Sequence, residues 1–484
     1  MTVRRGPLPF PNTKSILFDG ADDYLKISNS TVANTGQFTL SFWVKAPPKL
    51  TPSTANLISS PYYNINSFWS IGGSNFYWIN VGNAPYLLAN GVFDDTWHHI
   101  MVIFNPDNRP DINLGHIRCY VDGANVVDVN IGFTYAPGWN GGIYHGPIEF
   151  IGGNPGFGQK FVGKIDEFAA FEGNRESELT YIYNKGFPTN LNKLPVPPTA
   201  WYRMGDNGAY KDPQWLIPSN ENKDKVSNYS MEFDGVDDYV GTDYIYPSTG
   251  DLSVSYWVKT ISNSNPEYAL SIGAYTLNSG IGKIGYHNTQ GHYSVQYQAW
   301  DITHTSFLTW TATTPINLGE WYHILYVYDD STSPGRLSVY INGQLQTMLG
   351  WNGVMMVTQV EYDINNLPLI IGALTRPGFG PSNFLNGNVD EISIFESNQS
   401  ANVLTIYNNG TPNDLTPLNP VAWYRMGEEA TFSGSYWTVP DEVGTNNATS
   451  SGMLIDARIG DAPNSTNNAV SLNMDFVDVV LDTP

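Results

Sequence analysis

The words FDGADDY (Phe18–Tyr24) and FDGVDDY (Phe233–Tyr239) decide the architecture of this chain, because the same ordered landmarks follow each of them. The landmarks recur at separations of 214 to 224 residues: Trp43 with Trp257, Trp97 with Trp321, and Asp166 with Asp390. Domains usually hold about 100–200 residues, and solenoid repeats only about 20–50. The 484 residues therefore contain a duplicated domain rather than an array of short repeats.

The segments between these landmarks have the pattern of β-strands. FTLSFWVK (Phe38–Lys45) and LSVSYWVK (Leu252–Lys259) alternate large apolar residues with others at a period of two, which is typical of a strand. CYVDG and VYING end in Asp-Gly and Asn-Gly, which favour hairpin turns. We expect an all-β fold of two tandem antiparallel β-sandwiches with a short C-terminal extension.

Only two short stretches have a helical pattern. Their apolar residues fall three and four positions apart, and a glycine follows each stretch. The two sets are Leu179, Ile182 and Tyr183 before Gly186, and Val403, Ile406 and Tyr407 before Gly410. We expect single helical turns that lie against the sandwiches.

A third, incomplete copy is suggested by the C-terminal part of the chain. VAWYRMGEE (Val421–Glu429) matches TAWYRMGDN (Thr199–Asn207), and Ser471–Pro484 is similar to a decayed version of Ser230–Asp243. The expected division is 1–198 for the first sandwich, 199–418 for the second, and 419–484 for a partial third repeat that serves docking or assembly. Trp423–Met426 should add a strand to the second sandwich or to a neighbour. Truncation at Thr416 should leave two folded domains.

Composition narrows the partners and the compartment. The 45 acidic and 23 basic residues give a net charge of -22, which disfavours nucleic acid and anionic membranes as partners. The sequence has no apolar signal segment behind its first residues and no run of about 18 apolar residues, so we expect synthesis in a cytosol and no membrane insertion. The single cysteine, Cys119, excludes intrachain disulfides, and its strand pattern predicts that it is buried.

The ordered set of words resembles the laminin G-like module of the concanavalin A-like lectins, over about residues 15–190 and 199–412. The words are FDGxDDY, SFWVK or SYWVK, WHHI or WYHI, YVDG or YING, and KIDEF or NVDEI with a short helix after it. The resemblance implies jelly-roll sandwiches. WYRMG resembles the opening strand of such modules, which the first copy then lacks at its N-terminus.

Acidic residues cluster in the FDGxDDY words and could hold a cation. Ca²⁺ prefers six to eight oxygen ligands, and the resemblance implies a structural calcium in some members, with the turn close to the D-E word. The candidate ligands are Asp19, Asp23 and Asp166 in the first copy and Asp234, Asp238 and Asp390 in the second. Alternatively, the aspartates only cap the turns through their own side chains.

Aromatic residues mixed with Asn, Gln and Thr follow the SFWVK and SYWVK strands. Such a mixture suits stacking on sugar rings, and we name Trp69, Tyr77, Trp300 and Trp310 as a candidate glycan surface. The alternative is that these rings belong to the core.

The sequence argues against catalysis. Laminarinase-type glycosidases on this fold use E-I-D-x-x-E, whose two carboxylates stand about 5–5.5 Å apart. At the nucleophile position this chain has Lys164 and Asn388 instead. Asp166 and Glu167 are neighbours on a strand and should face opposite sides. We expect no enzyme and no cofactor except Ca²⁺, and a glycoside hydrolase is our third hypothesis.

Tandem lectin-like modules without export signal or disulfides resemble structural proteins of tailed phages, especially marine ones. The first hypothesis is a non-enzymatic virion surface protein, such as a capsid decoration, fibre or baseplate component, made in the host cytoplasm. It would be part of an oligomeric assembly and contact other virion subunits and cell-surface glycans. The alternative is a carbohydrate-binding module pair of a bacterial surface or secreted protein, located at the cell surface or outside the cell.

Overall fold

The computed structural model describes most of the chain and divides it into two units. Unit 1 is Met1–Asp224 together with Thr466–Pro484, and unit 2 is Lys225–Ser465. The chain therefore leaves unit 1 once, builds all of unit 2, and returns to finish unit 1. The described residues are 10–27, 37–48, 54–60, 67–71, 74–79, 86–106, 114–132, 148–156, 160–247, 249–262, 267–272, 280–287, 292–300, 307–331, 335–350, 359–360, 368–376, 380–465 and 467–484.

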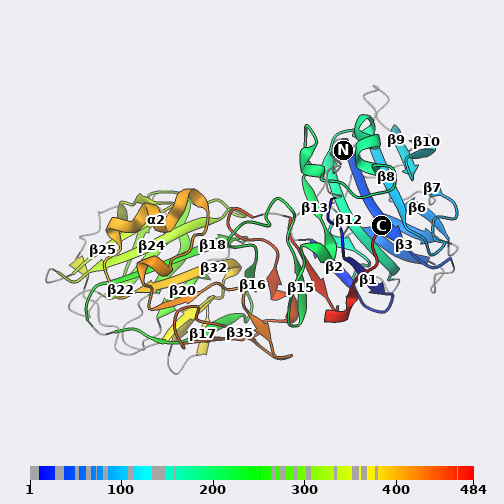
Figure 1. The fold of residues 1–484 in the computed structure, drawn as a ribbon. Coiled ribbons are helices and arrows are strands. Elements are labelled where there is room, and N and C mark those ends of the chain that lie inside the picture. The colour runs from blue at the N-terminus through cyan, green and yellow to red at the C-terminus, as the bar shows by residue number, and fades with distance from the viewer. Residues whose placement is uncertain are drawn as a thin grey trace, which may run out of the picture. The chain divides into compact units, whose positions relative to one another are not determined.

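Unit 1 is an antiparallel β-sandwich of two sheets (Figure 1). Sheet 1a runs in the order β10 (Ala124–Gly132), β9 (Leu114–Val121), β8 (His98–Pro106), β3 (Phe38–Lys45), β12 (Val162–Glu172), β1 (Ser15–Asp19) and β39 (Val479–Val480), with β13 (Ala200–Tyr202) also on β12. Sheet 1b runs in the order β14 (Ala209–Lys211), β15 (Gln214–Ile217), β38 (Ala469–Leu472), β2 (Tyr24–Ile27), β11 (Phe150–Ile151), β4 (Thr54–Ser59), β5 (Ser67–Ile71), β6 (Asn75–Ile79) and β7 (Tyr86–Ala89).

Unit 2 repeats this plan. Sheet 2a runs in the order β26 (Gln344–Leu345), β25 (Gly335–Ile341), β24 (Tyr322–Asp329), β18 (Leu252–Thr260), β32 (Asn386–Phe395), β16 (Ser230–Asp234) and β37 (Arg458–Ile459), with β28 (Gln359–Val360) on β25 and β33 (Ala422–Tyr424) on β32. Sheet 2b runs in the order β20 (Leu270–Ile272), β29 (Pro368–Ile371), β17 (Tyr239–Ile245), β36 (Ala448–Ser451), β35 (Trp437–Val439) and β34 (Thr431–Phe432). Sheet 2c contains β19 (Glu267–Tyr268), β21 (Gly280–His287), β22 (His292–Trp300), β23 (Phe307–Ala312) and β27 (Met348–Gly350), and β30 (Leu374–Arg376) pairs with β31 (Gly380–Ser382). The predicted fold class is confirmed for both units.

The alternation read from the sequence places the core. On β3, Phe38, Leu40 and Phe42 face the space between the two sheets and are buried there. Asp122 and Gly123 both have positive φ, as a two-residue hairpin turn requires, and they join β9 to β10 as predicted. Cys119 is buried in the same core, which confirms its predicted place.

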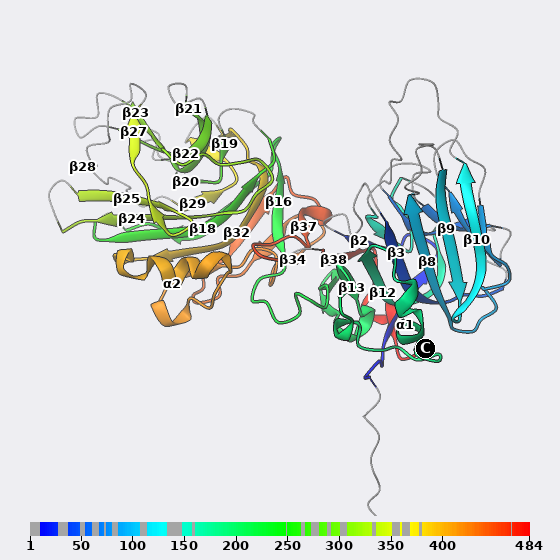
Figure 2. The ribbon, with the colours of Figure 1, turned by 90° about the horizontal axis from the view of Figure 1, so that it is seen from above.

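A second, smaller core lies on the outer faces of sheets 1a and 2a, away from the main cores. In unit 1 it includes Met101, Ala169, Ile182 and Trp201. The helix α1 and the turn η2 contribute to it through Ile182 and Leu191. The short helices described in unit 1 are η1 (Glu176–Glu178), α1 (Leu179–Tyr183), η2 (Leu191–Lys193), η3 (Met204–Asp206) and η8 (Phe476–Asp478). Those of unit 2 are η4 (Ser400–Asn402), α2 (Val403–Tyr407), η5 (Asn408–Gly410), η6 (Thr416–Leu418) and η7 (Ile455–Ala457). Figure 2 shows α2 on the face of sheet 2a that is turned away from β20 and β29. Both predicted helical turns are present.

The WYRMG words lie elsewhere than the repeat suggested. β13 carries the first of them and pairs with β12, and β33 carries the second and pairs with β32. Each WYRMG word is thus a late strand of the domain copy that comes before it in the sequence. The first copy therefore has a WYRMG strand of its own. The structure divides at 224/225 and 465/466 instead of 198 and 418, because strand pairing, which sequence similarity does not report, ties these segments to the preceding sheets. The prediction that the Trp423 segment adds a strand to the second sandwich is confirmed.

The C-terminal segment completes unit 1 rather than starting a third copy. β38 pairs with β2 and β15, and β39 pairs with β1 (Figure 1, where the red end runs beside the blue strands). Its counterpart is the end of unit 2, not Ser230–Asp243. Asp482 accepts a hydrogen bond from Trp97 Nε1 at 3.0 Å, as Asp461 does from Trp321 Nε1 at 3.1 Å. No described helix is long and apolar enough to span a membrane.

Candidate functional site

The acidic words form tight turns that their own side chains hold. In unit 2, the backbone N–H of Asp234 donates to Asp238 Oδ2 at 3.0 Å, and that of Val236 donates to Asp234 Oδ1 at 2.7 Å. Gly235 has a φ of +79°, which favours glycine. Unit 1 repeats the arrangement, with the N–H of Asp19 donating to Asp23 Oδ2 at 2.9 Å. The aspartates therefore do cap these turns through their own side chains, as the alternative interpretation expected.

Capping leaves other carboxylate oxygens of these turns available to a cation. Asp234, Asp237 and Asp238 each offer an oxygen within 4.8 Å of the others, and the same holds for a second set, Asp19, Asp22 and Asp23. We name these two sets the acid turns. The sequence prediction included the first and last aspartate of each set and omitted Asp22 and Asp237. The signal for them was the Asp-Asp doublet itself.

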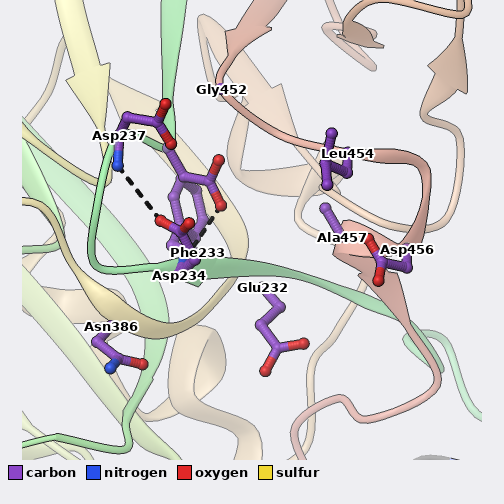
Figure 3. A pocket seen from close by; sticks show the side chains of 10 residues that line it. Glu232, Phe233, Asp234, Asp237, Asn386, Gly452, Leu454, Asp456 and Ala457 are labelled. Carbon is purple, nitrogen blue, oxygen red and sulfur yellow. Dashed lines mark hydrogen bonds between the residues drawn. The ribbon is translucent and has the colours of Figure 1, made fainter. Parts of the chain in front are cut away.

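The acid turn of unit 2 opens on a cavity of about 470 Å³ (Figure 3). On one side Figure 3 shows Asp234 and Asp237, and on the other the segment after β36 with Leu454 and Asp456. The lining residues are Glu232, Phe233, Asp234, Asp237, Asp238, Asn386, Gly452, Leu454, Asp456 and Ala457. Burial raises the pKa of Asp238 to about 6, and the neighbouring Asp234 and Asp237 add to this rise. In unit 1, burial raises the pKa of Asp23 to about 7.

A glycine keeps the cavity of unit 2 open next to the carboxylates. A Cβ on Gly452 would lie 2.6 Å from the carbonyl oxygen of Asp237 and 2.9 Å from Asp238 Oδ1. In unit 1, Asn473 follows β38 as Gly452 follows β36, and its Nδ2 donates to the Asp22 carbonyl at 3.3 Å. Carboxylate and carbonyl oxygens are the ligands that Ca²⁺ prefers, so the residues of the acid turns fit this ion.

The structure does not bring the acid turns and the D-E words together as the predicted combination of ligands requires. Asp19 pairs with Val162 and Asp234 with Asn386 across the sheets. Asp166 and Asp390 lie four residues further along β12 and β32, which is about 13 Å of strand. The antiparallel register, which the sequence does not display, separates the two groups.

The D-E words instead bind the WYRMG words. In unit 1, Trp201 Nε1 and Arg203 Nε donate to Glu167 at 2.6 and 3.0 Å. In unit 2, Trp423 Nε1 and Arg425 Nε donate to Glu391 at 2.8 and 3.1 Å. These glutamates have a φ of +48°, and each stands at a β-bulge that shifts the register of its strand. The two repeated words are thus partners within each unit.

Because of the bulge, the two carboxylates of the D-E word do not point in the directions that the sequence predicted. Asp390 and Glu391 do not face opposite sides, because their oxygens lie within 4.8 Å of each other and of Glu428. Hydrogen-bond donors already occupy five of the six carboxylate oxygens of this cluster. Asp390 accepts from the N–H of Glu391 and from Ser227 Oγ. Glu391 accepts from Trp423 and Arg425, and Glu428 accepts from the N–H of Tyr229. Burial raises the pKa of Glu428 to about 8 against the effect of Arg425. This cluster therefore holds a proton more readily than a metal.

Replacing Glu428 with Gln should flatten the pH dependence of unit 2 stability. Because the pKa of Glu428 is raised from 4.5 to about 8, folded unit 2 binds more protons than the unfolded chain between these values. The free energy of unfolding therefore falls as the pH rises through that window, by up to about 1.4 kcal/mol per pH unit. Urea unfolding between pH 5 and pH 8 should show this slope in the parent and a smaller one in Glu428→Gln. Glu320→Gln, at an exposed position, should keep the parent slope, and equal slopes in all three chains would contradict the prediction.

The predicted glycan residues are only partly described. Trp69 pairs with Tyr77 across β5 and β6, and Trp300 with Phe307 across β22 and β23, but the side chains of Trp69 and Trp300 lie outside the described part. Tyr77 is half-buried. Trp310 stacks on Tyr297 at 6.1 Å and packs against the core of unit 2. Contact of these four residues with sugar stays a prediction.

Comparison with known proteins agrees with this architecture. The family model described as "Concanavalin A-like lectin/glucanases superfamily" matches residues 19–178 and 234–404. No curated protein matches the chain.

Several solved structures are similar. A pentraxin from Limulus polyphemus is 17% identical, with 38% of this chain and 83% of the pentraxin covered and a TM-score of 0.30. Domains LG4-5 of the mouse laminin α1 chain are 11% identical, with 81% and 90% covered and a TM-score of 0.26. The CBM40 of a Ruminococcus gnavus IT-sialidase, bound to α2,3-sialyllactose, is 11% identical, with 37% and 97% covered and a TM-score of 0.26. These likenesses concern the fold alone.

Proposed function

The chain belongs to the concanavalin A-like lectin/glucanases superfamily, and from this premise we propose that it is a pair of carbohydrate-binding modules whose acid turns hold Ca²⁺. The observation that supports this most is the carboxylate-lined cavity of unit 2. It is large enough for a sugar residue, and its oxygens can accept hydrogen bonds from hydroxyl groups or share a bound cation with them.

The chemistry of the acid turns supports calcium over a purely structural role. Asp237 is exposed, and it takes part in the turn through its backbone N–H, which donates to Asp234 Oδ1 at 3.3 Å. Asp238 is buried beside two other carboxylates, which is unfavourable while all three are charged. A divalent cation would relieve this repulsion, so we expect it to bind in preference to a monovalent one.

Calcium should stabilise both units, and more so at higher pH. When the Ca²⁺ concentration is 100 times the dissociation constant, binding to the folded state raises the free energy of unfolding by about 2.7 kcal/mol. Because Ca²⁺ needs ionised carboxylates, its affinity should fall as the pH drops through about 7 in unit 1 and about 6 in unit 2, where Asp23 and Asp238 take up protons. Calorimetric titration and thermal melts with Ca²⁺ or EDTA measure both effects. Asp237→Asn should weaken binding in unit 2, and the exposed Asp243→Asn should not. An unchanged melting temperature in Ca²⁺ would contradict the proposal.

A glycan array with and without Ca²⁺ tests the carbohydrate part. Binding to one class of glycan that EDTA removes supports the proposal, and silence over the whole array counts against it. The absence of catalysis stays a prediction, which an assay for sugar released from β-glucans tests. The virion hypothesis rests on the sequence alone, and detection of the chain in purified particles would support it.

A further inference from the structure

An exposed aromatic ring stands on a rigid base at one corner of unit 1. Phe476 is 66% exposed, and its ring stacks on Trp215 with centroids 5.9 Å apart and an interplanar angle of 15°. Tyr210 meets Phe476 edge-on at 5.7 Å. Trp215 is buried in the core, and its Nε1 donates to the carbonyl of Asp475 at 2.8 Å. The contacts with Trp215 and Tyr210 therefore fix the orientation of the exposed Phe476 ring.

The fold itself does not require this ring. Trp437 occupies the place of Trp215 in unit 2, and its Nε1 likewise donates to the carbonyl of Leu454, the residue before η7. The first residue of η7 is Ile455, where η8 has Phe476. The same turn thus forms without an aromatic side chain. With 66% of its surface exposed, most of the Phe476 side chain is available to a ligand.

Two carboxylates belong to the same helical turn as the ring. Asp475 and Asp478 form a capping box around η8, so that Phe476 lies between them in sequence. Burial raises the pKa of Asp478, and the charges of Asp475 and Asp19 add to this rise. The helical turn η8 also contacts β1, the strand that leads into the acid turn of unit 1. Asn473 Nδ2 donates to the Asp22 carbonyl at 3.3 Å, so the C-terminal segment of unit 1 is in direct contact with its acid turn.

A flat ring flanked by hydrogen-bond acceptors has the chemistry of a sugar subsite. One face of a pyranose presents C–H groups, which pack on an aromatic face, while its rim presents hydroxyls, which donate to carboxylates. An apolar protein partner fits less well, because its docking would remove water from the carboxylates of Asp475 and Asp478.

We propose that Phe476, backed by Trp215 and Tyr210, is the stacking platform of a carbohydrate subsite in unit 1, with a pyranose ring as its occupant. The inference rests on the proposed carbohydrate-binding function and adds the location of one subsite. It also makes the two units unequal, because unit 2 has the cavity at its acid turn but an isoleucine at the platform position.

The test compares variants of the full chain on the strongest glycan found on the array. Phe476→Ala and Phe476→Leu should each bind roughly tenfold more weakly, because both lose the ring, and Phe476→Tyr should bind like the parent. Phe187→Ala is the matched control, since Phe187 is 65% exposed and should not affect binding. Titration calorimetry gives the affinities, and equal melting temperatures show that the variants fold.

The outcomes separate this inference from the proposed function. Parent-like affinity of Phe476→Ala for a glycan that the parent binds would overturn the inference and leave the proposed function intact. Full affinity of Phe476→Leu would show a nonspecific apolar contact and also overturn it. If light scattering shows a dimer of the parent that Phe476→Ala dissociates, the occupant is a second copy and the inference is wrong. No binding of any glycan by the parent counts against both.

Discussion

A chain that ends at Ser465 is expected to lose the fold of unit 1 and to keep that of unit 2. The missing segment supplies β38, which lies between β2 and β15, and β39, which pairs with β1. Val470, Leu472 and Met474 of this segment are buried. At about 1.5–3 kcal/mol for each side chain, their burial contributes about 5–9 kcal/mol, which is comparable with the whole stability of a domain.

Hydrogen exchange on the truncated chain measures this effect unit by unit. Protection should disappear from β1, β2 and β3 and persist in β16, β18 and β32. A synthetic peptide of residues 466–484, added in trans, should restore it. A second chain, in which a short Gly-Ser linker replaces residues 225–465, should fold as unit 1 alone, since Asn222 Nδ2 and Asn468 Oδ1 are only 2.9 Å apart. Retained protection of β2 in the truncated chain would contradict our assignment of the segment.

Truncation at Thr416 has a different expected result from the one that the repeat suggested. It removes β33 to β37 from unit 2 as well as β38 and β39 from unit 1. Both sandwiches lose strands of their sheets, so we expect two unfolded domains rather than two folded ones.

Removal of the D-E glutamate should strongly destabilise the unit that contains it. In Glu391→Ala, Arg425 loses the carboxylate it pairs with, and the buried Trp423 loses the acceptor of its Nε1 hydrogen bond. Breaking a buried ion pair by removing one partner costs about 3–5 kcal/mol. Glu167→Ala in unit 1 should cost the same, because its partners are equivalent.

Urea unfolding of the two variants measures these losses, and each should affect one unit only. Chain 225–465 serves to identify the transition of unit 2. Glu172→Ala is the control, because Glu172 lies at the exposed end of β12, and its loss should change the free energy of unfolding by less than about 0.5 kcal/mol. If Glu167→Ala costs no more than Glu172→Ala, the link between the repeated words is not a source of stability.

The sequence by itself determined the local structure and the number of sandwiches. Period-two alternation gave strands such as β3 and β18, Asp-Gly and Asn-Gly gave the hairpin turns, and self-comparison gave two copies. The acid turns were also visible, because their hydrogen bonds join residues two to four positions apart. Such features depend on neighbours along the chain, which a single sequence displays directly.

Only the tertiary structure decided which distant segments belong together. It placed Ser471–Pro484 in unit 1, some 450 residues after β2, and it joined Glu167 to Trp201 and Glu391 to Trp423. It also placed Asp166 apart from Asp19 and stacked the ring of Phe476 on that of Trp215. The physical reason is that strand pairing uses backbone groups common to all residues, so register and order within a sheet leave little trace in the sequence.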